Sequence, residues 1–323
     1  MKQIIALDPA DYQRHRIHGE NRIWAETNCY VDVWIELLHG WGFEPIAALP
    51  FTLAIDFEGD QWTFFKFSLR DLYRLYGLDV QELAIWRPLV DHIEEQVALG
   101  RPVLVELDSC FLPDTAGTAY RRDHVKSTVA VNAIDVAGRR LGYFHNQGYY
   151  HLDGDDFVDV FRLREPRDSS QLPPYVEFVK RRQPSVSTVG GLARISLGLL
   201  REQLAMLPVV NPFVKFKSRF TIDLEWLATE TLDMFHRYSF ATLRQFGACY
   251  ELSATFLTWL QQGLQLDLHE PIAIFTELAT DAKTLQFELA RAVMRKKPLD
   301  LSAIDRMATQ WQAAMDGIKA SAL

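Results

Sequence analysis

The sequence predicts an α+β protein: a helix packed on an antiparallel sheet in the first half, followed by an all-helical second half. Residues 29–39 carry apolar side chains at helical spacing, and residues 102–152 contain short apolar or alternating runs typical of strands. Residues 192–323 hold amphipathic runs with no strand pattern. Because the chain has 323 residues, we expect about two domains. They are predicted at 1–165 and 191–323, joined by a proline- and serine-rich linker at 166–190.

The first predicted helix begins near Cys29, because Thr27 or Asn28 is a good N-cap, and it ends at Gly40. Two aromatic-rich runs, 51–57 and 61–67, predict a β-hairpin. The other elements expected in this domain are a short helix from Ser68 to Gly77, a helix at 88–99, and strands at 102–107, 124–134, 141–146 and 149–152.

The second domain is predicted to be a bundle built over an apolar seam. Its helices are expected at 192–207, 222–238, 241–262 and 271–296, with a fifth opened by the capping box of Ser302 and Asp305.

The residues that point to chemistry are a cysteine, a histidine and an asparagine, far apart in sequence. Cys29 lies in the first turn of its helix, where the dipole and the unpaired N–H groups favour thiolate. His124 opens one predicted strand and Asn146 ends the next, so antiparallel pairing brings them close. We therefore expect Cys29 as nucleophile, His124 as base and Asn146 as the residue that orients the imidazole, with His145 as a competing candidate for that last role.

This order of residues is the order found in papain-like enzymes. The segments Asn28-Cys29, 100–108, Phe111-Leu112-Pro113 and His124 are similar to the N-terminal domain of the butirosin side-chain acyltransferase. The resemblance covers roughly residues 26–160. It implies a papain-like fold and transfer of an acyl group from a carrier-protein thioester to an amine, with phosphopantetheine arriving on the carrier and no cofactor bound by the chain itself.

Nearly the whole chain also resembles a bacterial family catalogued as domain of unknown function 1839. The segments that carry this match are 112–115, 143–146 and 240–245. Relatives in that family are associated with carrier proteins and with aminoacyl-carrier ligases, which implies an aminoacyl thioester as the donor.

One departure concerns the oxyanion hole. Papain relatives place a glutamine a few residues before the cysteine, and no glutamine lies between Gln13 and Cys29. Asn28, or Asn21 from the preceding segment, would have to stand in beside the Cys29 backbone N–H. Asp108 ends an apolar strand and is expected to hydrogen-bond the loop that follows. Cys110, in that loop, is a weaker candidate nucleophile.

Charge and composition argue against several classes of function. The net charge of −8 argues against general nucleic-acid binding, and the spacing of cysteine and histidine does not match a metal site. No apolar run reaches membrane-spanning length, and we expect a cytoplasmic protein with free thiols. The window 180–219 carries a net charge of +7, so Lys215, Lys217 and Arg219 are predicted to dock an acidic carrier protein. The alternative is an ordinary solvated linker and exposed turn.

Two other functions stay open at this point. The same three residues could serve a peptidase or amidase, in which water takes the acyl group. The fold could also be a non-catalytic binding module, an interpretation that the missing upstream glutamine favours.

Overall fold

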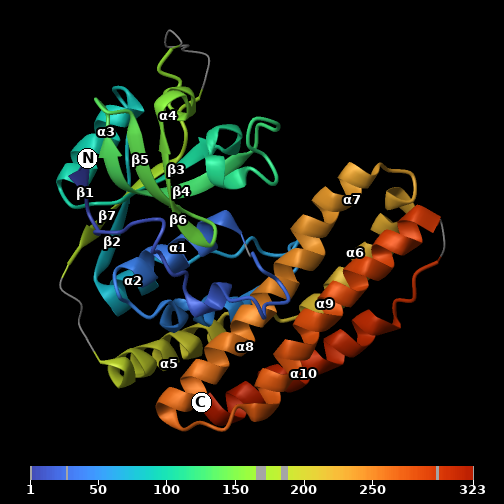
Figure 1. Ribbon diagram of the computed structural model, residues 1–323. Helices are drawn as coiled ribbons and strands as arrows, with labels where there is room; N and C mark the ends of the chain where they lie inside the picture. Colours follow the sequence, from blue (N-terminus) through green and yellow to red (C-terminus); the bar gives the residue numbers. More distant parts are fainter. Residues whose placement is uncertain (1, 27, 165–171, 183–187, 296–297, 323) are drawn as a thin grey trace. The chain divides into compact units, whose positions relative to one another are not determined.

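The computed structural model describes residues 2–26, 28–164, 172–182, 188–295 and 298–322 (Figure 1). The chain forms two compact units that alternate along the sequence. The sheet unit comprises Met1–Gly19, Asn28–Pro45 and Leu72–Ser185. The helical unit comprises Glu20–Thr27, Ile46–Asp71 and Val186–Leu323. The predicted α+β class, with an antiparallel sheet and a helical C-terminal part, is confirmed.

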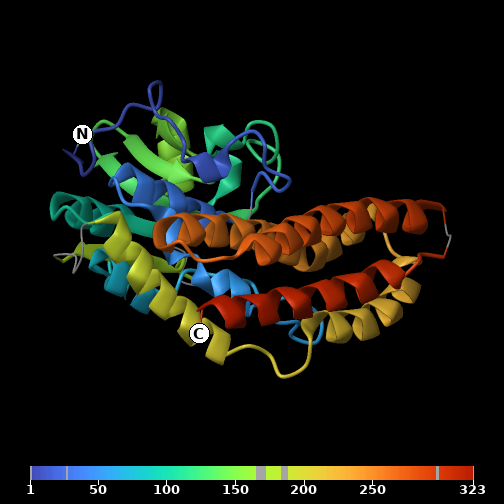
Figure 2. The same cartoon turned by 90° about the horizontal axis from the view of Figure 1, so that it is seen from below.

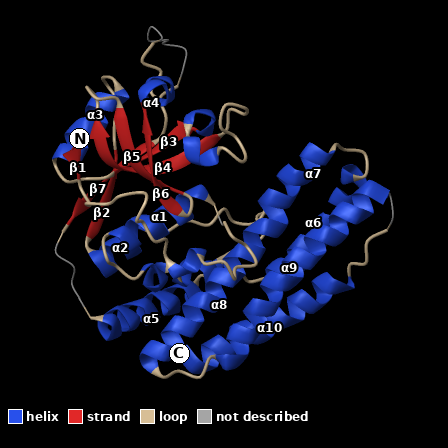
Figure 3. Ribbon diagram, in the orientation of Figure 1, coloured by secondary structure: helices blue, strands red, loops and turns tan. Residues whose placement is uncertain are grey.

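The described part of the sheet unit contains seven strands, drawn in red in Figure 3. Their order is β2-β7-β3-β4-β5-β6, with β1 added on β4, and every pairing is antiparallel. The bounds are β1 Lys2–Gln3, β2 Leu78–Glu82, β3 Val103–Asp108, β4 Lys126–Asp135, β5 Arg140–His145, β6 Gly148–Asp153 and β7 Val176–Arg181.

The predicted linker at 166–190 is wrong in its middle part, because strand β7 lies there. β7 pairs with β2 on one side and β3 on the other, and Val176 and Val179 are buried. A strand that lies between partners from far earlier in the chain leaves little local signal, because its stability comes from long-range pairing. The other parts of that linker, 165–171 and 183–187, lie outside the described residues.

Helices cover both faces of the sheet. α1 (Cys29–Gly40) packs on β4, β5 and β6, and every residue from Tyr30 to Leu38 is buried. On the other face, side chains of α3 (Leu89–Ala98) and α4 (Gly154–Val160) join the core formed by β3, β4 and β5. β4 is buried from Ser127 to Ile134, and this stretch includes the polar residues Ser127, Thr128 and Asn132 as well as apolar ones.

The predicted hairpin at 51–67 is also wrong. Pro50 instead opens a 3-10 helix, Pro50–Ala54, and only an isolated bridge joins Phe57 to Trp62. The aromatic side chains of this segment are buried within the helical unit, where the Trp62 ring lies 5.1 Å from that of Phe213 and 5.0 Å from that of Phe246. The apolar pattern of residues 51–67 therefore reflects burial against helices rather than pairing of two strands.

The helical unit holds the long helices shown in Figures 1 and 2, where α8, α9 and α10 lie side by side. The predicted helix at 222–238 is two helices, because the chain turns at 228–230 and Thr231 caps the second one. The other α-helices among the described residues are α2 Leu69–Tyr76, α5 Val189–Ala205, α6 Pro212–Leu227, α7 Leu232–Ser239, α8 Gln245–Leu264, α9 His269–Arg295 and α10 Ser302–Ala322, with a π-helical segment at Phe240–Arg244.

Candidate functional site

Cys29 is the first residue of α1, as its sequence context predicts. The Asn28 side chain caps the helix, because its Oδ1 accepts a hydrogen bond of 3.0 Å from the Val31 N–H. Cys29 is half-buried, whereas Cys110 and Cys249 are buried. Its Sγ lies 3.7 Å from the Thr128 Oγ1 on β4, so the thiol is held against the sheet at a helix N-terminus.

His124 lies at the other end of the loop that follows β3. Its Nδ1 is 2.6 Å from the Asp108 Oδ2, and its ring meets Phe111 edge-on at 5.9 Å. With Nδ1–H donating to Asp108, the Nε2 of the neutral ring carries the lone pair that a base needs. The His124 side chain is 71 % exposed.

A pocket of about 300 Å³ borders this His–Asp pair. Its lining combines the pair with an aromatic ring and with charged side chains from the end of α4 and the turn after it. The lining residues are Asp108, Phe111, His124, Val158, Asp159, Arg162 and Arg164.

The structure brings the predicted catalytic residues to one region of the sheet but not into contact. Asp108 of β3, the partner of His124, pairs with Lys126 of β4. Lys126 lies two residues before Thr128, the partner of Cys29. Among the described residues, no hydrogen bond joins Cys29 to His124 or His124 to Asn146. Asp108, expected to hydrogen-bond the loop that follows and to support the catalytic residues, accepts from the Cys110 N–H and also contacts His124.

Asn146 occupies the two-residue turn between β5 and β6. Its φ of 45° is left-handed, a conformation that asparagine adopts more readily than most residues. The sequence predicts this residue at the end of a strand, in position to orient His124. In the structure its conformation is explained by the turn between His145 and Gly148.

His145 joins a buried network on the opposite face of β4 from Cys29. Its Nε2 lies 2.6 Å from the Ser127 Oγ, and its Nδ1 lies 2.5 Å from the Asp114 Oδ2. The other Asp114 oxygen accepts a hydrogen bond of 2.6 Å from the Tyr143 hydroxyl. Burial, and then the negative charge of Asp114, raise the pKa of Tyr143, so this hydroxyl stays protonated and can donate.

The hydrogen-bonded chain Ser127–His145–Asp114 has the same order of residue types as a Ser-His-Asp catalytic triad. Ser127 is 9 % exposed, however, and the side chains of His145 and Asp114 are 1 % and 3 % exposed. We therefore interpret the network as a support that ties the loop after β3 to the sheet. Sequence reasoning missed Ser127 and Asp114, although Asp114 lies in one of the segments that carry the family resemblance.

This interpretation predicts a loss of stability in Asp114→Asn, of about 1–3 kcal/mol, because the amide cannot accept from both Tyr143 and His145 as the carboxylate does. Denaturant unfolding of the purified protein measures it. Asp155→Asn is the matched control, since that carboxylate is 77 % exposed. Equal midpoints for the two variants would show that the network contributes nothing.

A second buried polar cluster lies along α1. The His18 Nε2 is 3.2 Å from the Asp32 Oδ1, and its Nδ1 contacts Glu36, which also accepts from the Tyr12 hydroxyl at 2.5 Å. Burial lowers the pKa of His18, but the hydrogen bonds and charges of Asp32 and Glu36 outweigh it and raise the pKa to about 9. His18 is therefore a buried cation at neutral pH. The sequence analysis did not single out His18. The sequence signal for this cluster is the pair Asp32 and Glu36, which lie four residues apart in a largely apolar helix.

The three predicted docking cations belong to α6, not to an exposed turn. Lys217 lies 2.6 Å from Asp305, the Arg219 Nε lies 2.6 Å from Asp223, and Lys215 contacts Asp56. Carboxylates that lie outside this window, one of them in the same helix, thus offset its positive charge. Docking of a carrier protein there stays a prediction.

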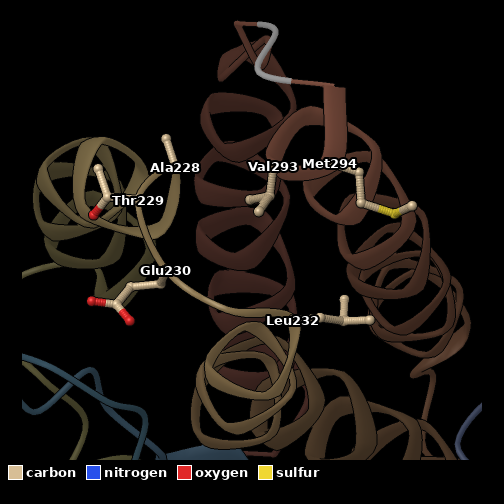
Figure 4. Close-up of a pocket in the computed structure, with 6 residues that line it drawn as sticks. All are labelled: Ala228, Thr229, Glu230, Leu232, Val293 and Met294. Atoms are coloured by element: carbon tan, nitrogen blue, oxygen red, sulfur yellow. The ribbon is translucent and has the colours of Figure 1, made fainter.

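A larger pocket, of about 500 Å³, lies in the helical unit between the turn after α6 and the end of α9 (Figure 4). Leu232 and Val293 lie on opposite walls, and Glu230 is the one ionisable side chain among the lining residues. The lining contains no cysteine or histidine, so Glu230 is its one candidate general base. The lining residues are Ala228, Thr229, Glu230, Leu232, Val293 and Met294.

Two further tests apply to the described part of the chain. None of its helices combines the length and the apolar character needed to cross a bilayer. No group of three histidine, cysteine or acidic side chains among these residues is arranged to hold a metal ion.

The fold and the site define an α+β protein with a half-exposed cysteine at a helix N-terminus and a nearby His–Asp pair. The chain belongs to the DUF1839 family: the DUF1839 N-terminal domain matches residues 13–181, and the DUF1839 C-terminal domain matches residues 190–320. The predicted membership of this family is confirmed. No curated protein matches the chain.

Proposed function

We propose that this protein is a cysteine-dependent acyltransferase, which moves an aminoacyl group from a carrier-protein thioester to an amine. Cys29 is the nucleophile, His124 the base, and Asp108 the residue that orients His124. The papain-like fold and the thioester donor come from the resemblance to the butirosin side-chain acyltransferase. The chemistry of the site supports the roles proposed for Cys29, His124 and Asp108.

The observation that carries the proposal is the placement of Cys29. It combines a helix N-terminus, a capping asparagine and partial exposure, the conditions under which a thiol becomes a useful nucleophile. Cys110 and Cys249 do not meet these conditions, since both are buried and neither begins an α-helix.

His124 and Asp108 supply an acid–base pair at the same end of the β3–β4 ladder. His124 contacts Asp108 and Phe111 rather than Cys29, so the proposal requires its exposed ring to reach the thiol when the donor is bound. Catalytic hydrogen bonds often form only in the substrate complex, which is compatible with this requirement. In this assignment Asp108 takes the role that the sequence predicts for Asn146.

The proposed reaction has two steps. In the first, His124 takes the proton of the Cys29 thiol and the thiolate attacks the thioester carbonyl. The bond from carbonyl carbon to carrier sulfur then breaks, and the carrier thiolate takes the proton from His124 and leaves as the thiol. In the second, an amine attacks the acyl-Cys29 thioester, His124 accepts the amine proton, and the thiolate is released as the amide forms. The Cys29 backbone N–H, with Asn28 beside it, is the candidate donor to the oxyanion in both steps.

We expect a covalent acyl adduct on Cys29. The protein is mixed with an alanyl thioester, on N-acetylcysteamine or on a carrier protein, and its intact mass is measured within seconds. The wild-type mass should rise by one alanyl group, and Cys29→Ser should show no adduct on the same time scale. Cys110→Ser is the matched control and should react as the wild type does.

Three outcomes of this experiment are informative. An adduct that persists in Cys29→Ser would disprove the assigned nucleophile. Amide formation when an amine is added supports the transferase, whereas release of the free amino acid alone would make the protein a hydrolase. An inert Cys29 with both donors would favour the non-catalytic binding module.

A further inference from the structure

The segment 20–26, which precedes α1 in the sequence, is held by the helical unit. The unit boundary falls between residues 27 and 28, so Glu20–Thr27 belong to the helical unit and α1 to the sheet unit. The described residues of this segment, 20–26, have no helix or strand of their own. Their position is set instead by contacts with α8, α9 and the π-helical segment.

Glu251 of α8 binds the backbone of the segment directly. Its two carboxylate oxygens accept hydrogen bonds from the Ile23 N–H at 2.8 Å and the Trp24 N–H at 3.0 Å. The Arg22 Nε lies 3.1 Å from the same carboxylate. Bonds from two consecutive backbone amides to one ionised group fix the direction of the chain as well as its position.

Trp24 fills a space that α8 leaves for it. Its ring is 3 % exposed, its Nε1–H donates to the Ala279 carbonyl of α9 at 3.0 Å, and the Lys283 Nζ lies 4.3 Å from the ring centre. Gly247 of α8 makes room for the ring, because a Cβ there would come within 2.6 Å of two indole carbons. Glycine disfavours helices, so its presence inside α8 is explained by this close approach.

Arg244 holds the end of the segment. Its guanidinium donates to the Glu26 carbonyl at 3.1 Å and lies 3.5 Å from the Glu26 carboxylate. Arg244 ends the π-helical segment Phe240–Arg244, a kind of distortion common at functional positions. The same stretch, 240–245, is one of the three that carry the family resemblance. It binds a residue three positions before Cys29.

From these contacts we propose that the helical unit positions the nucleophile through the segment 20–26. Arg244, Gly247 and Glu251 are then positioning residues for Cys29, and they act through the covalent chain that leads into the start of α1. The inference rests on the proposed role of Cys29 and adds a function for the helical unit. A segment held this firmly restrains the first turn of α1, and with it the capping of the helix and the environment of the thiol.

The sharpest test is Gly247→Ala. Alanine is the better helix former, so α8 should persist while the new methyl group displaces Trp24. Gly198→Ala in α5 is the matched control, because it makes the same change in a helix of the same unit, where a Cβ meets nothing within 4 Å. Far-ultraviolet circular dichroism checks that both variants keep their helices.

Two measurements report on the start of α1 without needing the substrate. Hydrogen exchange should be at least tenfold faster in Gly247→Ala at the Val31 and Asp32 amides, which bond to Asn28. The rate of Cys29 alkylation by iodoacetamide at one fixed pH, measured in a variant with Cys110 and Cys249 replaced by serine, should fall, because the thiol loses its place at the helix N-terminus. Gly198→Ala should leave both measurements unchanged.

A second variant, Glu251→Gln, keeps the shape of the side chain and removes the charge that binds the two amides, so it should shift both measurements in the same direction. Unchanged exchange in both variants would overturn the inference. Faster exchange with an unchanged alkylation rate would also overturn it, because the segment would then hold the chain without affecting the nucleophile. Neither result bears on the acyl-adduct experiment, which tests Cys29 in the wild-type protein.

Discussion

Replacing His124 by alanine is expected to slow acyl transfer by roughly 10²–10⁴-fold, the contribution typical of a positioned general base. The proposed base is bound to Asp108 through Nδ1, which leaves Nε2 to accept the proton of the attacking amine. Because the His124 side chain is 71 % exposed, its loss should cost little stability. Single-turnover transfer from pre-formed acyl-Cys29 to an amine measures the effect on the second step alone.

Two variants separate this catalytic effect from a structural one. His151→Ala removes an exposed histidine from β6 of the same unit and should leave the transfer rate unchanged. Asp108→Asn keeps an acceptor for the Cys110 N–H but weakens the hold on the imidazole, so it should slow transfer by about tenfold or more. Wild-type rates in His124→Ala would remove His124 from the mechanism.

Replacing His18 by alanine is expected to lower the free energy of unfolding by about 3–5 kcal/mol. The substitution leaves Asp32 and Glu36 buried without the cation that lies between them. His18→Gln restores hydrogen-bond donors without the charge, so it should be intermediate. Denaturant unfolding near pH 6 measures all three proteins, and a loss no larger than that of His151→Ala would show that the cluster is not an ion pair in the folded protein.

The same cluster predicts how stability depends on pH. The folded pKa of His18, about 9, lies above the ordinary value of 6.5, so the folded state holds its proton more tightly than the unfolded state does. Its stabilising contribution, about 3 kcal/mol, is therefore fully present below pH 6.5 and is lost as the pH rises through about 9. His18→Gln should lose this part of the pH dependence, and an unchanged slope between pH 6.5 and 9 would contradict the assignment.

The sequence alone determined the elements whose signals are local. Cys29 was placed at a helix N-terminus from its cap and the apolar stripe behind it, and α1 begins at that residue. The strands at 102–107 and 141–146 and most of the later helices were found in the same way, since periodicity and caps need no knowledge of distant partners. The match to the DUF1839 family also followed from short segments of sequence.

Only the tertiary structure decided what each polar side chain contacts. Nothing local shows that His124 pairs with Asp108, that Asp114 binds Tyr143 and His145, or that His18 lies between two carboxylates of α1. It also decided that β7 is a strand inside the sheet, that Trp62 packs among helices, and that Glu251 holds the chain ahead of Cys29. The physical reason is common to all of these. A helix or a turn is stabilised by bonds between near neighbours in sequence, whereas strand pairing, burial and ion pairs depend on residues that only folding brings together.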